Sequence, residues 1–187
     1  MKRGLFPFAL SFLIASVAES GAGLAFELKS PDIAEGKTIG AKHIYNSFGC
    51  TGENLSPALE WGDPPAGTKS FAVLVHDPDA PTGGAGFWHW LVIDIPASAR
   101  GLPQGAGDPA GKRLPAGAKQ LETDFGDVGY GGPCPPKGHG DHRYVFTVYA
   151  LGVEKLDIPA HARTAAVGFT VNQHALAKAS LTARFGR

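Results

Sequence analysis

Four side chains that can do chemistry stand where apolar runs meet turn-rich segments: Asp77, Asp79, His89 and His142. The two aspartates belong to the sequence Asp-Pro-Asp-Ala-Pro, a rigid elbow in which proline restricts the backbone. His89 lies among aromatic residues, where desolvation favours the neutral ring and demands a hydrogen-bond partner. Taken alone, His89 would be a satisfied core histidine. The neighbouring carboxylates favour a functional role, because they could orient the imidazoles and set their tautomers.

Three apolar runs must position these side chains. Residues 70–76 and 87–95 predict two long buried strands, and residues 142–151 predict a third. The Gly/Pro-rich loop at residues 130–140 leads into the third strand and suits a stiff loop at a cavity mouth. If the three strands are neighbours, the four polar side chains converge at one edge of a sheet. The main helical signal lies at residues 159–178, so the predicted fold is mainly β with one or two C-terminal helices.

Composition favours one β-rich domain. The chain has 187 residues, with 26 glycines and 15 prolines spread along it, which indicates many turns. Seventeen basic and 17 acidic residues balance, so no basic stripe indicates nucleic-acid binding. Shorter strands are predicted at residues 26–30, 59–61 and 181–185, and residues 97–119 are predicted to be irregular.

The N-terminal residues have the layout of a secretory signal peptide. Lys2 and Arg3 precede an apolar stretch at residues 5–18, and small residues suited to cleavage follow. This stretch is shorter than the roughly 20 residues of a membrane span; a membrane anchor is the alternative. We therefore expect a signal peptide at residues 1–25, one domain at residues 26–187, and a periplasmic or secreted protein without a transmembrane span.

Cys50 and Cys134 are the two cysteines of the chain. An even number of cysteines in an exported protein favours a disulfide. In the chain-entropy model such a long closed loop stabilises the fold by about 4–5 kcal/mol. The bond would tie the loop at residues 130–140 to the loop around Cys50, and it would leave no thiolate for catalysis. Two buried free thiols are the alternative.

Two other kinds of site are less well supported. His139, Asp141 and His142 form a possible metal cluster, but they lie on a Gly/Pro loop rather than at the helical spacing of metalloproteases, so no metal is expected. A hydrolase with His89 or His142 as general base is compatible with the composition. The sequence contains no G-x-S-x-G motif to supply its nucleophile.

Nearby cations and aromatic residues have structural explanations. Lys137 is expected to be a solvated loop residue, and Arg143 a partner for an aspartate. Trp88, Trp90 and Tyr130 could line a pocket between the strands or pack the core, and the core is favoured. We keep Trp88, Tyr130 and Arg143 as supporting residues of the predicted site.

Four ordered motifs resemble the phosphatidylethanolamine-binding proteins, also called Raf kinase inhibitor-like proteins. They are Asp-Pro-Asp-Ala-Pro from Asp77, Trp-His-Trp around His89, Gly-Pro-Cys-Pro-Pro-Lys-Gly from Gly132, and His-Arg-Tyr from His142. The segment Cys-Thr-Gly-Glu-Asn-Leu-Ser-Pro at residues 50–57 is similar to the bacterial branch. The resemblance runs over nearly all of residues 26–187.

The resemblance implies a β-sandwich with a large central antiparallel sheet, a smaller sheet, a few short helices and an anion pocket at one end. In the family that pocket takes phosphate-type groups, including phospholipid head groups and phosphorylated side chains. Its lining residues match Asp77, His89, Pro136 and His142 here, with Asp79 as a scaffold. We expect this chain to lack the extra C-terminal helix of eukaryotic members, which argues against kinase inhibition.

From these observations we predict a non-enzymatic binding protein with a small-anion pocket and no cofactor. Asp77 would hold one imidazole, His89 and His142 would donate to the ligand's oxygens, and Pro136 would form an apolar wall. One alternative is an inhibitor or signalling partner of a protease or kinase that acts through its surface. The other is the hydrolase described above.

Overall fold

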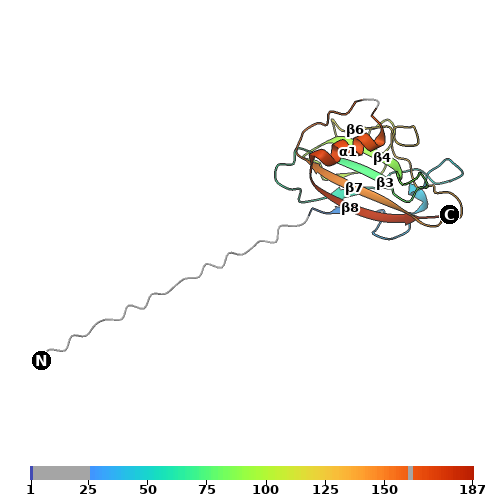
Figure 1. Cartoon of the computed structure of the whole chain (residues 1–187), viewed down its shortest axis with the longest axis horizontal. Helices are drawn as coiled ribbons and strands as arrows, with labels where there is room; N and C mark the ends of the chain where they lie inside the picture. Colours follow the sequence, from blue (N-terminus) through green and yellow to red (C-terminus); the bar gives the residue numbers. More distant parts are fainter. Residues whose placement is uncertain (2–25, 160–161) are drawn as a thin grey trace.

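Two antiparallel sheets form the protein in the computed structural model, which describes Met1 and residues 26–159 and 162–187 (Figure 1). The larger sheet has the strand order β6-β4-β3-β7-β8, and the smaller has the order β1-β2-β5. The larger sheet comprises β3 (Ser70–Asp77), β4 (Phe87–Pro96), β6 (Lys119–Gln120), β7 (His142–Leu151) and β8 (Ala175–Phe185). The smaller comprises β1 (Leu28–Lys29), β2 (Leu59–Trp61) and β5 (Gly101–Leu102). The predicted mainly-β sandwich is thereby confirmed.

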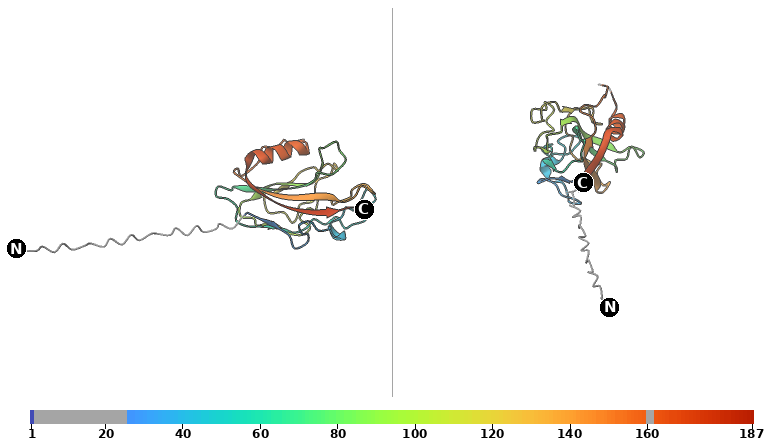
Figure 2. Two further views of the ribbon diagram at one scale, coloured as in Figure 1. Left: turned by 60° about the horizontal axis from the view of Figure 1, so that its bottom comes forward. Right: turned by 90° about the vertical axis from the view of Figure 1, so that its left-hand side faces the viewer.

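The larger sheet is covered on both faces, which explains its apolar strands. On one face, Phe71 and Val73 of β3 pack with Trp61 of the smaller sheet. On the other face, Leu74 of β3 belongs to a cluster that includes Val167 of the helix α1 (Thr164–His174). Figure 2 shows α1 on one side of the larger sheet and the N-terminal segments on the other. A strand buried on both faces has no need of alternating polar residues.

The C-terminal part of the fold corrects the predicted helix at residues 159–178. The helix α1 ends at His174, and the strand β8 begins at Ala175 rather than at residue 181. Residues Ala175 to Lys178 instead pair with Leu151 to Tyr149 of β7. Alanine has a high helix propensity. The side of β7 that faces away from β3 offers a full ladder of hydrogen bonds, and this tertiary context overrides propensity.

Smaller elements complete the chain. Residues 97–119, predicted to be irregular, contribute only β5 and the first residue of β6. A short 3-10 helix, η1, spans Ala41–His43. The predicted signal peptide lies outside the described residues except for Met1. Among the residues that are described, no helix combines the length and apolarity needed to cross a bilayer.

Strand register brings the predicted site residues together. Antiparallel pairing places Asp77, the last residue of β3, opposite Phe87, the first residue of β4. On the other side of β3, His76 pairs with Val145 near the start of β7. The end of β3 and the starts of β4 and β7 therefore lie at one edge of the sheet. This arrangement confirms that the three long runs are neighbouring strands.

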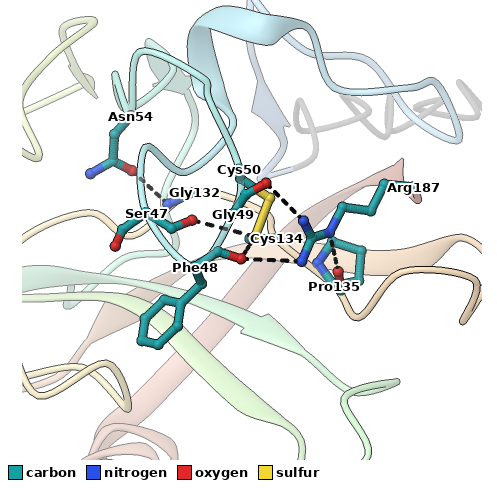
Figure 3. Close-up of a disulfide and its surroundings, with 9 residues drawn as sticks. All are labelled: Ser47, Phe48, Gly49, Cys50, Asn54, Gly132, Cys134, Pro135 and Arg187. Atoms are coloured by element: carbon teal, nitrogen blue, oxygen red, sulfur yellow. Dashed lines mark hydrogen bonds between the residues drawn. A yellow bond between two sulfur atoms is a disulfide. The ribbon is translucent and has the colours of Figure 1, made fainter.

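The predicted disulfide between Cys50 and Cys134 is present, with the two Cα atoms 6.0 Å apart (Figure 3). It joins the loop before β2 to the loop before β7. Beside it, Asn54 bridges the same two loops: its side chain accepts from the Gly132 amide at 2.7 Å and donates to the Tyr130 carbonyl at 3.0 Å. The disulfide therefore reinforces a contact that hydrogen bonds also maintain.

We expect the double substitution Cys50→Ser and Cys134→Ser to lower the free energy of unfolding by about 2–5 kcal/mol, because the unfolded chain loses its cross-link. Urea unfolding followed by tryptophan fluorescence measures the change. Wild-type protein unfolded with a reductant serves as the control and should match the double variant. An unchanged midpoint in both cases would show that the disulfide contributes nothing to stability.

Candidate functional site

A pocket of about 490 Å³ opens at the edge of the sheet where the long strands begin and end. This volume falls within the usual range for small-molecule sites. Its wall is mostly apolar: Phe48, Ala80, Pro81, Phe87, Phe125, Pro135, Pro136 and Tyr144. The four predicted ligand-binding residues, Asp77, His89, Pro136 and His142, all line it. Their shared position is a structural fact, and their role in binding stays a prediction.

Asp77 and His142 form a buried pair on the pocket wall. The carboxylate Oδ2 of Asp77 accepts a hydrogen bond from Nδ1 of His142 at 2.6 Å, and the two residues are only 3% and 2% exposed. The other oxygen of Asp77 accepts from the Asp79 amide at 2.8 Å. This bond fixes the tautomer of a neutral His142 ring: the proton sits on Nδ1, and Nε2 is the ring atom left for other partners.

His139 contacts the Nε2 atom of His142. Its Nδ1 lies 2.7 Å from Nε2 of His142, and in the neutral state His139 is the donor. The sequence suggested a role for His139 only as a metal ligand with Asp141 and His142. In the structure its ring is an exposed cap on His142, and no cluster of three or more metal-ligating side chains occurs among the described residues.

His89 is held in a different way. Its Nδ1 donates to the Gly131 carbonyl at 2.7 Å, and the edges or faces of Phe87, Phe125 and Tyr144 surround the ring at 5.2–5.4 Å between centroids. A Cβ at Gly131 would collide with Phe125, so only glycine brings the loop this close. Burial lowers the pKa of His89 to about 4. The ring is therefore neutral at neutral pH with its proton on Nδ1, so the predicted donation from Nε2 to a ligand would require His89 to take up a proton.

Asp79 has the scaffold position that the sequence suggested. Arg143 donates to both of its carboxylate oxygens, from Nε at 2.9 Å and Nη2 at 2.7 Å, and the Arg143 amide adds a third bond at 2.8 Å. The Arg143 side chain and amide lower the pKa of Asp79 from 3.8 to about 2, although partial burial opposes this. Arg143 is thus occupied by the elbow and does not line the pocket.

Comparison with known proteins identifies the family. The family model described as phosphatidylethanolamine-binding protein matches residues 29–186. The protein YbhB of Escherichia coli is 50% identical over 159 residues, which is 85% of this chain and 99% of that protein. The crystal structure of E. coli YbcL, described as a new member of the mammalian family, superposes with a TM-score of 0.84 at 46% identity, covering 87% of this chain and 98% of that one. This chain belongs to the phosphatidylethanolamine-binding protein family.

A more distant structural relative agrees with the assignment. A phosphatidylethanolamine-binding protein homologue from Chlamydia trachomatis superposes with a TM-score of 0.71 at 28% identity. The alignment covers 87% of this chain and 98% of the chlamydial one. The fold predicted from the family resemblance is therefore found in crystal structures of members of this family.

Tyr144 and Arg187 are among the pocket residues that were not predicted from the sequence. Tyr144 lines the pocket, and its buried hydroxyl has no hydrogen-bond partner among the described residues. Period-2 alternation along β7 could have found it, since His142 and Tyr144 share a face. Arg187 also lines the pocket. It follows the last strand, whose Phe185 pairs with His142, and no local motif connects it with the site.

Other expected residues lie elsewhere. Trp88 stacks on His76, with 4.2 Å between ring centroids, and packs beneath α1. The Tyr130 hydroxyl is buried and donates to the His43 carbonyl at 2.9 Å. Both support the fold rather than the pocket, as the preference for core packing predicted. Lys137 is an exposed loop residue, as expected.

We predict that Arg143→Gln returns the pKa of Asp79 toward its usual value of about 3.9, because the charged donors are lost. In the wild type, this carboxylate stabilises the fold above about pH 4, and the contribution disappears as the pH falls through about 2. Carboxyl titration by NMR measures the shift. Arg184→Gln, at an exposed position on β8, is the matched control and should leave Asp79 unchanged. A low pKa for Asp79 in the Arg143 variant would contradict this assignment.

Proposed function

We propose that this protein is a non-enzymatic binding protein whose pocket takes a small phosphorylated ligand, such as a phospholipid head group or another phosphate ester. The observation that carries the proposal is the pocket itself: a buried Asp77–His142 pair and a buried, unpartnered Tyr144 hydroxyl within an apolar wall. The unpartnered hydroxyl is notable because buried polar groups normally have partners. The family model's description, phosphatidylethanolamine-binding protein, supports this ligand class.

The volume and wall of the pocket favour an organic ester over bare phosphate. A phosphoryl group reaching His142 and Tyr144 would leave most of the 490 Å³ for its organic part. Phe87, Phe125 and Pro136 would then contact that part. The polar groups would orient the ligand, and the apolar wall would exclude water from their hydrogen bonds.

The positions of the protons make ligand binding dependent on pH. His89, which is neutral at neutral pH, donates its Nδ1 proton to a carbonyl, and Nδ1 of His142 donates to Asp77. The Nε2 of His89 therefore carries no proton, and the same holds for Nε2 of His142 whenever that ring is neutral. A ligand oxygen can bond to such a nitrogen only if the ligand is protonated or if the imidazole takes up a proton. Either route requires a proton from solution when a phosphate dianion binds.

An enzymatic role is less well supported. In a hydrolase, the Nε2 of an Asp-oriented histidine activates a nucleophile within hydrogen-bond reach. Here the lining residues, all in the described part of the chain, include no serine, and their one cysteine, Cys134, is bonded to Cys50. We therefore propose binding without turnover. Action as an inhibitor or signalling partner through the surface stays a prediction of the sequence analysis.

We also propose that the protein is exported. A protein named as a lipoprotein, LppC of Mycobacterium tuberculosis, is 37% identical over 158 residues, covering 84% of this chain and 71% of that one. The Cys50–Cys134 disulfide is compatible with an oxidising compartment such as the periplasm. The signal peptide predicted at residues 1–25 supports the same localisation.

We expect O-phosphorylethanolamine to bind the wild type and to bind His142→Ala at least about tenfold more weakly, because the variant loses a ligand-facing imidazole. Isothermal titration calorimetry measures both affinities. His174→Ala, at an exposed helix end, is the matched control. Since alanine also leaves the Asp77 carboxylate unpaired, His142→Gln is tested as a variant that offers Asp77 an amide donor. Equal binding by all four proteins, each shown folded by circular dichroism, would refute a role for His142.

We further expect the affinity for O-phosphorylethanolamine to rise as the pH falls from about 8 to about 6, by at most tenfold per pH unit for each proton taken up. Titrations in buffers of different ionisation enthalpy count the protons directly, and we expect net uptake. A pH-independent affinity, without proton exchange, would mean that the unprotonated Nε2 atoms do not contact the ligand.

A further inference from the structure

We infer that Arg187 is the cation that binds the ligand's phosphoryl oxygens in this pocket, acting together with the hydroxyl of Tyr144. This inference rests on the proposed function and extends it, since neither the family motifs nor the strand pattern assigns Arg187 a role. Three independent observations carry it: the charges that line the pocket, the way the guanidinium is seated, and the unpartnered hydroxyl of Tyr144.

The charges of the pocket wall require a cation. Asp77 and Asp124 are the lining carboxylates, and His89 is neutral at neutral pH. Both oxygens of Asp124 are engaged, by the Trp88 amide at 2.8 Å and the Thr164 hydroxyl at 2.7 Å. Among the lining residues, all of which lie in the described part of the chain, Arg187 is the one lysine or arginine. Without Arg187, a dianion entering the pocket would meet two carboxylates and no lysine or arginine.

Backbone carbonyls hold the guanidinium of Arg187 in place (Figure 3). Its Nε donates to Pro135 at 2.6 Å, its Nη1 to Gly49 at 3.0 Å and its Nη2 to Phe48 at 3.3 Å. These acceptors lie next to the two bridged cysteines in the sequence. The disulfide-linked loops therefore fix the position of the guanidinium. The Arg187 carbonyl in turn accepts from the Gly138 amide at 2.8 Å. The side chain is therefore ordered before any ligand binds, which lowers the entropic cost of binding.

The guanidinium of Arg187 keeps N–H groups that can donate to a ligand. A guanidinium has five N–H groups, and the three bonds to carbonyls engage one on each nitrogen. Nη1 and Nη2 each retain one N–H, and a phosphoryl oxygen can accept a charge-assisted hydrogen bond from either. A residue that served only to hold the loops would not also need to line the pocket, as Arg187 does.

Tyr144 supplies the second donor. Its hydroxyl is buried and lacks a partner among the described residues. Burial raises the pKa of Tyr144, and the positive charge of Arg187 opposes this shift, which places Arg187 within electrostatic reach of the hydroxyl. A phosphoryl oxygen that binds Arg187 would also satisfy the unpartnered hydroxyl. Unlike His89, these two residues can donate without taking up a proton.

The test compares Arg187→Gln, Arg187→Lys and the matched control Arg184→Gln in calorimetric titrations with inorganic phosphate. We expect Arg187→Gln to weaken binding about ten- to a hundredfold, as for the loss of a charged hydrogen-bond donor. We expect Arg187→Lys to retain part of the affinity, because it keeps the charge but not the planar fork. Arg184→Gln, which removes an exposed charge outside the pocket, should bind like the wild type.

Salt dependence separates ligand binding from a structural role. If Arg187 pairs with the anion, wild-type affinity falls as sodium chloride is added, and Arg187→Gln loses most of that dependence. An equal loss of affinity in the Gln and Lys variants, with an unchanged salt dependence and a lowered melting temperature, would show that Arg187 only holds the loops and would overturn the inference. Binding of phosphate by Arg187→Gln as tightly as by the wild type would also overturn it.

The experiment distinguishes this inference from the proposed function beneath it. If the wild type binds neither phosphate nor O-phosphorylethanolamine, the proposed function fails and the inference fails with it. If the wild type binds, His142→Ala does not and Arg187→Gln binds normally, the proposed function stands and Arg187 is not its cation. Tyr144→Phe provides an internal check: it should weaken phosphate binding, and its effect together with Arg187→Gln should be less than additive if both contact the same oxygens.

Discussion

The hydrogen bond between Asp77 and His142 constrains everything else at the pocket. Two ionisable groups that are almost fully buried must stay paired, because leaving either one alone would be strongly destabilising. Pairing requires β3 and β7 to keep the register in which His76 lies opposite Val145, because this register brings the last residue of β3 close to the first residue of β7. It also sets which nitrogen of His142 carries the proton. The fold thus determines the chemistry of the pocket through one bond of 2.6 Å.

That bond and the bond from His89 to Gly131 both engage imidazole N–H groups. They leave the proposed anion site with few free hydrogen-bond donors. Two histidines line it, yet burial keeps His89 neutral, and both Nδ1 atoms point to acceptors within the protein. Tyr144 and Arg187 can donate without any proton uptake. In the proposed complex the neutral His89 ring would accept a ligand proton, which would suit a group that carries both charge and an exchangeable proton, as phosphate esters do.

Sequence patterns predicted what depends on local order, and they missed what depends on long-range pairing. Continuous apolar runs predicted β3, β4 and β7, since a strand buried on both faces must be apolar. Alanine-rich residues after His174 suggested helix because propensity is local, whereas the free edge of β7 is not visible in the sequence. Arg187 was missed for the same reason: 45 residues separate it from His142, and only β8 brings the two together. The His139 cap depends on loop geometry that spacing alone does not define.

Rigidity is distributed unevenly around the pocket, and this decides what a ligand must displace. Strand ends hold Asp77 and His142, and the disulfide-linked loops hold Arg187, so these groups need no rearrangement. His139 is different, because its exposed ring occupies the His142 nitrogen that a ligand would use. Breaking this one partly buried hydrogen bond costs about 0.5–1.5 kcal/mol, which is too little to close the site. The His139 ring therefore satisfies the lone pair on Nε2 of the buried His142. The rigid strands and disulfide-linked loops keep most of the binding geometry already formed.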